Sequence, residues 1–347
     1  MPPGAAAPPD APAAPPKIAI VGCGALGSFY GAKLCRSGLE THFLLRSDYD
    51  VVRRHGVAVR SPEGGFVARP HCARAPDEIG PCDWVVIGLK TTANHELPRL
   101  LPPLLGPTTR VVTLQNGLGN EARLAAVLGA ERVFGGLCIV GLNRVQPGII
   151  EHIGLGRVVL GDYQRPASAA ARGLAARFQG AGVPCDTTDD LERARWEKLV
   201  WNVPFNGLGV AGSAGYEAVM GRAEPVPERL GPCLTTAELL ADPHWEQLAR
   251  ELMLEVIAAA NALGWPIGQE LADEQMARTR RLGAYKASTL IDFERGQPLE
   301  LESLFLEPLR RARSAGVPTP RLAALCHVLS RLDPGSRAIG ARSDRDG

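Results

Sequence analysis

The sequence predicts an α/β protein: a doubly wound sheet with helices on both faces, followed by an all-helical C-terminal domain. Residues 17–34 read as an apolar strand, a glycine turn and a helix, and the apolar runs at 83–89 and 110–114 are typical of buried parallel strands. From about residue 189 to residue 329 the pattern is helical. A chain of 347 residues is also too long for one typical core, so we expect two domains.

The glycine turn has the pattern G-x-G-x-x-G at Gly22, Gly24 and Gly27. The first glycine permits a tight turn, the second lets a pyrophosphate approach the backbone, and the third lets the helix pack close to the strand. The N–H groups of the first helical turn then face the phosphates. This predicts a Rossmann-type domain whose turn, with Cys23, Ala25 and Leu26, binds a dinucleotide; an ordinary strand-to-helix turn is the alternative.

The end of the second strand, residues 40–45, indicates which dinucleotide binds. NAD sites usually have an acidic residue there to hold the ribose 2′-OH, whereas this chain has Arg46. A guanidinium pairs well with a 2′-phosphate, so we expect NADP(H). The alternative is a solvated surface arginine.

Two polar residues follow the next parallel strands. Lys90 comes after the strand at 83–89, and Asn116 comes after the strand at 110–114. Because ligands of open parallel sheets sit at the carboxyl ends of the strands, both residues are expected at the same edge as the glycine turn. Each could instead be a helix cap or turn former.

The remaining elements of the first domain follow from periodicity and turn residues. We expect helices at 47–55, 93–105 and 168–179, a hairpin at 56–67, and strands at 133–140, 148–152, 157–160 and 183–187. The strands at 133–140, 148–152 and 157–160 are expected to continue the sheet in antiparallel fashion. Asp189 is a candidate cap for the next helix, which places the domains at 17–188 and 189–332.

The helical half opens with a polar stripe on an otherwise apolar helix. Lys198, Asn202 and Asn206 recur every four residues and therefore share one face. Buried polar groups need partners, and an amine with two amides would suit a small polar ligand. The stripe could also be structural and tie one helix to another. Pro204 predicts a kink nearby.

A second candidate segment covers residues 287–302. One helix is expected to end at Gly296, and the next to begin near Pro298 with acidic residues in its first turns. Acidic residues are favoured there by the helix dipole alone. The pattern alone does not decide whether Glu300 stabilises the helix dipole or contacts a substrate.

Composition limits the functional classes. The formal net charge of +1 gives no reason to expect nucleic acid or an anionic membrane, and no apolar run is long enough to cross a bilayer. Residues 1–16, almost all Ala and Pro, are expected to form a disordered leader, and residues 333–347 a flexible tail. The eight scattered cysteines fit reduced thiols in a cytoplasmic protein, without a metal site.

Lysine is scarce in this chain. Only five of the 38 basic residues are lysine, which leaves 38 − 5 = 33 arginines. Where arginine supplies nearly every positive charge, a remaining lysine more often does what a guanidinium cannot, such as give up a proton near neutral pH. This bias supports a chemical role for Lys198.

Together these segments resemble the ketopantoate reductase family, the 2-dehydropantoate 2-reductases of the PanE/ApbA type. The resemblance covers residues 17–330. It is carried by G-C-G-A-L-G at 22–27, Arg46, G-L-K at 88–90, L-Q-N-G at 114–117, E-K-L-x-x-N-x-x-x-N at 197–206, and S-T-L-x-D-x-E-R-G-x-P-x-E-L-E at 288–302.

The resemblance implies a reaction and roles for the candidate residues. NADPH would deliver hydride to the 2-keto carbon of ketopantoate in pantothenate and coenzyme A biosynthesis, and Lys198 would protonate the nascent alkoxide. Asn116 would orient substrate and nicotinamide, with Lys90 lining the same pocket. The remaining implied substrate contacts are Asn202, Asn206, Ser288 and Glu300. Hydride addition leaves charge on oxygen, which favours a cation that can also donate a proton.

Departures from the family pattern leave the substrate open. Thr289 stands where the family often has Met, and Leu301-Glu302 replaces the frequent Ile-Asp. A hydroxyacid or opine-type dehydrogenase of the same architecture therefore remains an alternative, as does a non-catalytic NADP-sensing protein. The expected partner is a small 2-keto acid, and a homodimer is the candidate assembly.

Overall fold

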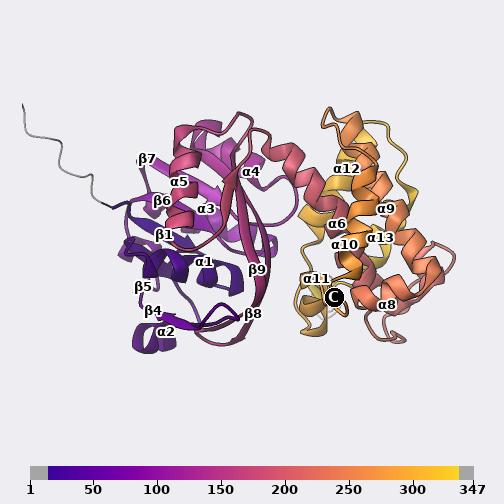
Figure 1. Cartoon of the computed structure of the whole chain (residues 1–347), viewed down its shortest axis with the longest axis horizontal. Helices are drawn as coiled ribbons and strands as arrows, with labels where there is room; N and C mark the ends of the chain where they lie inside the picture. Colours follow the sequence, from indigo (N-terminus) through magenta and orange to yellow (C-terminus); the bar gives the residue numbers. More distant parts are fainter. Residues whose placement is uncertain (1–14, 336–347) are drawn as a thin grey trace, which may run out of the picture.

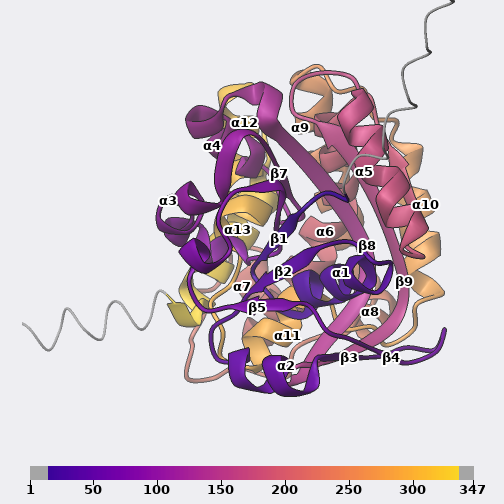
Figure 2. The same cartoon turned by 90° about the vertical axis from the view of Figure 1, so that its left-hand side faces the viewer.

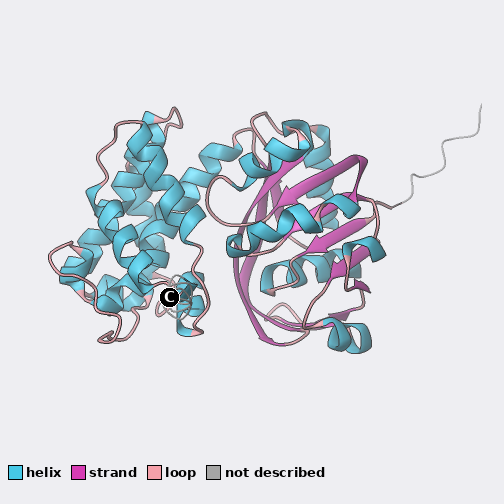
Figure 3. Ribbon diagram, turned by 180° about the vertical axis from the view of Figure 1, so that it is seen from behind, coloured by secondary structure: helices cyan, strands magenta, loops and turns pink. Residues whose placement is uncertain are grey.

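The computed structural model describes residues 15–335, which form a large sheet with helices on both faces and, beside it, a bundle of helices (Figure 1). Viewed from behind, the sheet lies on one side of the molecule and the helical bundle on the other (Figure 3). The predicted fold class, an N-terminal Rossmann-type sheet followed by a helical region, is confirmed. The first part of the leader, residues 1–14, lies outside the described residues.

The ten strands within residues 15–335 belong to one sheet, in the order β4-β3-β9-β8-β7-β6-β1-β2-β5, with β10 paired to β9. The strands from β8 to β5 in this order are parallel to one another, whereas β9 runs antiparallel to β8. Their bounds are β1 Ile18–Val21, β2 Thr41–Leu44, β3 Val57–Arg60, β4 Phe66–Ala68, β5 His71–Ala73, β6 Cys82–Ile87, β7 Leu105–Thr113, β8 Val133–Gln146, β9 Ile149–Asp162 and β10 Cys185–Thr187.

Alternating side chains of the central strands build two separate cores. Ile18 and Ile20 of β1 pack with Phe29 of α1 (Ala25–Arg36) and Phe178 of α5 (Ala169–Gly180) on one face. Ala19 and Val21 point to the other face, where α3 (Leu97–Leu100) and α4 (Asn120–Leu128) cover the sheet. Turned by 90°, the molecule shows α1 lying across the sheet (Figure 2). The sheet is therefore doubly wound, and ligands of such sheets bind at the carboxyl edge.

Most predicted elements of the sheet region are present with small shifts. The hairpin at 56–67 is β3 and β4, and the helix at 47–55 is α2 (Tyr49–His55). Two predicted strands, 148–152 and 157–160, are one strand, β9, which pairs with β8 over a long hairpin containing register shifts. The predicted helix at 93–105 is mostly wrong, because 3₁₀ turns at Thr91–Glu96 and Pro102–Leu104 flank the short α3.

The bundle packs around α6 (Leu191–Ala211), which contacts α9, α11 and α13. Its other elements are α7 Tyr216–Val219, α8 Thr236–Ala241, α9 Pro243–Ala262, α10 Glu270–Arg280, α11 Ser288–Glu294, a π-helical turn Glu302–Leu306, α12 Glu307–Ser314 and α13 Pro320–Leu332. Pro204 lies inside α6, which continues through it to Ala211. Among the described residues, no helix combines the length and apolar character that crossing a membrane requires.

Three local predictions need correction. The cap of α6 is Asp190, whose carboxylate accepts from the N–H of Arg193, while Asp189 accepts from the N–H of Ala167. The helix expected near Pro298 begins only at Leu301, so Glu300 precedes it. Asp333, predicted as the first tail residue, is buried and accepts from the N–H of Leu299. The remainder of the tail from residue 336 lies outside the described residues.

Candidate functional site

The glycine turn between β1 and α1 has the geometry of a phosphate-binding turn. Gly22 has a φ of +99°, and a Cβ at Gly27 would lie 2.1 Å from the carbonyl oxygen of Gly22, so neither position accepts a side chain. A Cβ at Gly24 would meet nothing within 4 Å. Gly24 is also the N-cap of α1, with no side chain capping it. The turn therefore leaves open space before the free N–H groups of a helix, where a pyrophosphate fits.

The predicted residues Lys90 and Asn116 follow strands that end at the same edge of the sheet as this turn. A Cβ at Gly22 would lie 2.2 Å from the backbone nitrogen of Leu89, so the glycine turn touches the segment that leads to Lys90. Asn116 follows β7, the neighbour of β6 in the sheet. The edge prediction for Lys90 and Asn116 thus agrees with the strand order.

Lys198 reaches from the helical bundle to the sheet. Its ammonium donates to the side-chain oxygen of Asn116 at 2.8 Å and to the backbone carbonyl of Cys138, in β8, at 2.7 Å. Lys198 is half-buried between these groups. The amine of the helical half and the amide at the sheet edge therefore meet at one point.

Burial changes the proton affinity of this amine. Desolvation lowers the pKa of Lys198 to about 8, and the positive charge of Arg195 acts in the same direction. The Cys138 and Glu300 side chains partly oppose the shift. A lysine with this pKa is mostly protonated at pH 7 and releases its proton far more easily than a lysine in water. Such a group is suited to proton donation near neutral pH.

Glu300 lies at the junction of the two halves. One carboxylate oxygen accepts from the backbone N–H of Thr91 at 2.8 Å and from the Thr91 hydroxyl at 3.1 Å, and Ser303 donates to the same hydroxyl. Burial raises the pKa of Glu300, while the bonds from Thr91 and the charge of Lys90 act against the rise. The other carboxylate oxygen has no protein hydrogen bond among the described residues, so it could accept from a ligand.

Lys90 pairs with a residue for which the sequence predicted no role. Its ammonium forms an ion pair with Asp292 of α11, and the lysine side chain is half-exposed. Asp292 belongs to the S-T-L-x-D segment at 288–292, so the motif carried a signal for this residue. The ion pair joins the sheet edge to α11.

The two asparagines of the α6 stripe have different surroundings. Asn206 is buried, and its side-chain oxygen accepts from the Ser288 hydroxyl at 3.2 Å and the Thr289 N–H at 3.1 Å, at the start of α11. Asn202 is also buried but makes no side-chain hydrogen bond to the described residues. Asn206 thus holds α11 against α6, and Asn202 is left with its polar groups available to a ligand.

Arg46 is exposed just beyond β2, at the carboxyl edge. Among the described residues its guanidinium forms no ion pair, although its charge helps lower the pKa of Glu96. The position is the one that the sequence predicted for a contact to the 2′-phosphate.

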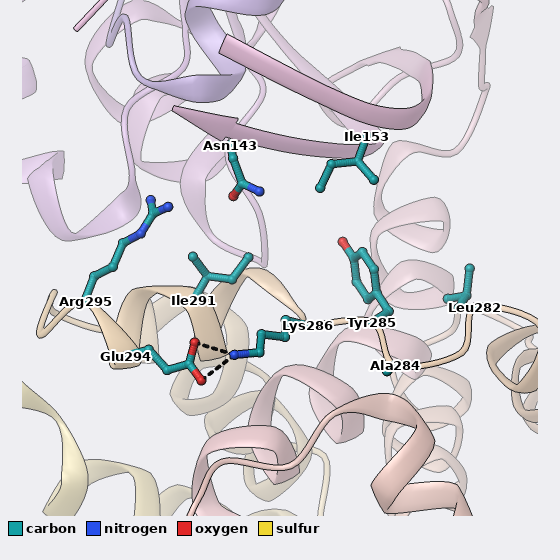
Figure 4. Close-up of a pocket in the computed structure, with 9 residues that line it drawn as sticks. All are labelled: Asn143, Ile153, Leu282, Ala284, Tyr285, Lys286, Ile291, Glu294 and Arg295. Atoms are coloured by element: carbon teal, nitrogen blue, oxygen red, sulfur yellow. Dashed lines mark hydrogen bonds and ion pairs between the residues drawn. The ribbon is translucent and has the colours of Figure 1, made fainter. Parts of the chain in front are cut away.

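A pocket of about 490 Å³ opens beside the predicted site, between the β8–β9 hairpin and α11 (Figure 4). In Figure 4 Asn143 and Ile153 project from the hairpin, and Lys286 is paired with Glu294 on the opposite side. None of the predicted site residues lines this pocket, although Ile291 is only one helical turn from Ser288. The other lining residues are Leu282, Ala284, Tyr285 and Arg295.

The helical turn after Glu300 explains how the bundle holds the Asn116 loop. In the π-helical turn the Glu307 N–H donates to the carbonyl of Glu302, and Pro308 has no N–H, so the carbonyl of Ser303 is left free. It accepts from the N–H of Leu118 at 2.9 Å. Sequence periodicity could not have found this contact, because it depends on one irregular helical turn.

Two family models match the chain. The model of ketopantoate reductase PanE/ApbA matches residues 18–165, and that of the ketopantoate reductase PanE/ApbA C terminal matches residues 232–333. The chain is 37% identical to a 2-dehydropantoate 2-reductase of Nostoc sp., over 92% of this chain and 96% of that protein.

Solved structures show the same fold. A crystal structure of 2-dehydropantoate 2-reductase from Geobacter metallireducens superposes with a TM-score of 0.82 at 44% identity, covering 91% of this chain and 99% of that one. A ternary structure of D-mandelate dehydrogenase with NADH and anilino(oxo)acetate has a TM-score of 0.79 at 19% identity, covering 92% and 99%, which shows a shared fold alone. From its sequence, its sheet order and these matches, the chain belongs to the ketopantoate reductase PanE/ApbA family of oxidoreductases.

Proposed function

We propose that this protein reduces a 2-keto acid to the 2-hydroxy acid with NADPH, and that its substrate is 2-dehydropantoate, which places it in pantothenate and coenzyme A biosynthesis. The contact of the Lys198 ammonium with Asn116 carries this proposal. This contact brings the amine that we assign as the proton donor from the bundle to the sheet edge that holds the glycine turn. The names of the relatives support the choice of substrate.

The residues at the sheet edge fit a dinucleotide. The space at Gly24 would take the pyrophosphate between Cys23 of the glycine turn and the first turn of α1, which contains Ala25 and Leu26, and Arg46 would contact the 2′-phosphate. Lys90 and Asn116 lie further along the same edge, toward the bundle. When bound, the cofactor supplies the hydride.

The protein's own groups would control the proton and the substrate. The Lys198 ammonium donates a proton to the oxygen that becomes negative, and Asn116 keeps the amine directed at that point. Asn202, Asn206 and Ser288 would hold the substrate's carboxylate and hydroxyl oxygens. The free oxygen of Glu300 would accept from a substrate hydroxyl, and Lys90 would line the same site. Each of these roles requires the substrate to lie between α6 and the sheet edge.

The rate of reduction should depend on the protonation of Lys198. Since the pKa of this amine is lowered to about 8 and only the protonated form donates, kcat/KM for keto acid reduction should be constant below that pH and fall about tenfold per pH unit above it. Oxidation of the hydroxy acid should show the opposite slope. Initial rates between pH 6 and pH 10 test this, and a reduction profile that is flat to pH 10 would contradict the assignment.

Arg46 should determine the choice between NADPH and NADH. Arg46→Ala should raise the KM for NADPH by about 10- to 100-fold, because a charge-assisted contact to the 2′-phosphate is lost, and leave the KM for NADH unchanged. Arg278→Ala, an exposed arginine of α10, is the matched control. Equal changes for both cofactors would count against a 2′-phosphate contact.

A panel of 2-keto acids assayed by NADPH oxidation tests the reaction itself. The pocket beside α11 favours a second candidate, a dehydrogenase for a larger apolar 2-keto acid, because Ile153 and Leu282 at this pocket are 53% and 42% exposed. Faster turnover of 2-dehydropantoate supports the first candidate, and faster turnover of bulky keto acids supports the second. No turnover of any keto acid, with NADPH still bound, would favour a sensing protein.

A further inference from the structure

We infer that Arg195 is a positioning residue. It holds the loop that carries Asn116 against Lys198, and its guanidinium places a positive charge near the Lys198 amine. This rests on the proposed function, in which Lys198 donates the proton. Arg195 lies three residues before Lys198 on α6, so the two side chains leave the same face of the helix about one turn apart. Neither periodicity nor the family motif marked Arg195 in the sequence.

Arg195 holds the sheet-edge loop on both sides of Asn116. Its Nη1 donates to the carbonyl of Gln115 at 2.7 Å, and its Nη2 pairs with the carboxylate of Glu121 in the first turn of α4. Asn116 itself accepts from Lys198. The contacts form a closed ring from α6 through Arg195, Gln115 and Asn116 back to α6, so the loop cannot shift without breaking one of them.

The ion pair between Arg195 and Glu121 is buried in the interior of the protein. Only 2% of the Arg195 side chain and 3% of the Glu121 side chain are exposed, and the Nε of Arg195 is buried without a hydrogen-bond partner. A Cβ at Gly135 of β8 would lie 2.4 Å from a carboxylate oxygen of Glu121, so a glycine makes room for the pair. A buried ion pair with an unsatisfied donor adds little stability compared with apolar packing, which points to a role other than stability.

Arg195 also contributes a permanent positive charge beside the amine. The charged and polar groups that face Lys198 are Asn116 from the loop, Cys138 from β8, Glu300 from the segment before the π-helical turn, and Arg195 from its own helix. Of these, only Arg195 carries a positive charge. Its charge favours loss of the lysine proton, and Glu121 partly neutralises that charge.

The scarcity of lysine allows a direct measurement of this effect. The chain has five lysines, so the protein labelled with ¹³C-lysine should give five ε-carbon signals, and the signal lost in Lys198→Ala identifies Lys198. Its titration needs no substrate. Arg195→Met should raise the pKa of Lys198 by about one pH unit, because a nearby cation is removed and Glu121 remains. Glu121→Gln should lower the pKa of Lys198, because the charge of Arg195 is then less neutralised.

Kinetics test the positioning role. Arg195→Met should lower kcat by about 100-fold while NADPH affinity stays unchanged, because the loop carrying Asn116 loses its anchor. Arg195→Lys keeps the charge but cannot hold both acceptors, so the pKa of Lys198 should stay near that of the native protein while kcat still falls. Arg132→Met is the matched control, because Arg132 donates to the carbonyls of Thr109 and Gly106 at 2.8 Å, beside the start of β8 and away from Asn116.

The outcomes separate the two proposals. If the native protein reduces no 2-keto acid, the proposed function fails, and the lysine titrations still report on Arg195. If the native protein is active, and the pKa of Lys198 is the same in Arg195→Met, Glu121→Gln and Arg132→Met, the inference is overturned. Should Arg195→Met fail to fold, the other two variants test the role of Arg195. A lowered pKa of Lys198 in Glu121→Gln and a lowered kcat in Arg195→Lys would support it, and native values of both would overturn it.

Discussion

Lys198→Ala is expected to lower kcat for keto acid reduction by about 1,000-fold while NADPH still binds. The substitution removes both the proton donor and the positive charge that faces the developing alkoxide. NADPH affinity should persist because the glycine turn and Arg46 belong to the sheet region, and Lys198 enters from α6. Steady-state rates with 2-dehydropantoate, together with a fluorescence titration of NADPH, measure the two effects separately.

Lys17→Ala is the matched control for this substitution. Lys17 precedes β1 and donates to the carbonyl of Ile79, at the edge of the sheet opposite the glycine turn. Its loss should leave kcat unchanged. Turnover in Lys198→Ala within about tenfold of the native rate would be too high for a lost general acid, and would remove Lys198 from that role.

Gly24→Val is expected to weaken NADPH binding by about 100-fold without destabilising the protein. The valine side chain would enter the space assigned to the pyrophosphate. The resulting clash should reduce the binding free energy of NADPH by an amount on the order of 1–3 kcal/mol. The free protein should tolerate the change, because a Cβ there meets nothing within 4 Å and the φ of Gly24 is −74°. Dissociation constants for NADPH and thermal denaturation midpoints test both parts.

Gly180→Val provides the comparison. A Cβ at Gly180, the last residue of α5, also meets nothing within 4 Å, and this position lies outside the glycine turn. Gly180→Val should bind NADPH with the same affinity as the native protein. If Gly24→Val binds NADPH as tightly as Gly180→Val does, the pyrophosphate does not lie at Gly24, and the proposed placement of the dinucleotide is wrong.

Local pattern predicted those features that depend on neighbours in the sequence. The strand, turn and helix at 17–34 and the hairpin at 56–67 appear as predicted. The predicted helix types and bounds were wrong where the backbone departs from a regular α-helix. Residues 93–105 form 3₁₀ turns around a short helix, and the helix expected near Pro298 begins at Leu301 and passes at once into a π-helical turn. Helical periodicity in a sequence does not distinguish an α-helix from these tighter or wider turns.

By itself the sequence determined the fold class, the glycine turn with its open position at Gly24, and the stripe that contains Lys198, because each depends on spacing along one element. Only the tertiary structure decided which polar groups meet. Lys198 contacts Asn116 across 82 residues, and Thr91 contacts Glu300 across 209 residues. Periodicity specifies the face that a side chain occupies, but its partner depends on how the bundle docks against the sheet. For that reason the partners of Asp292 and Arg195 emerged only from the structure.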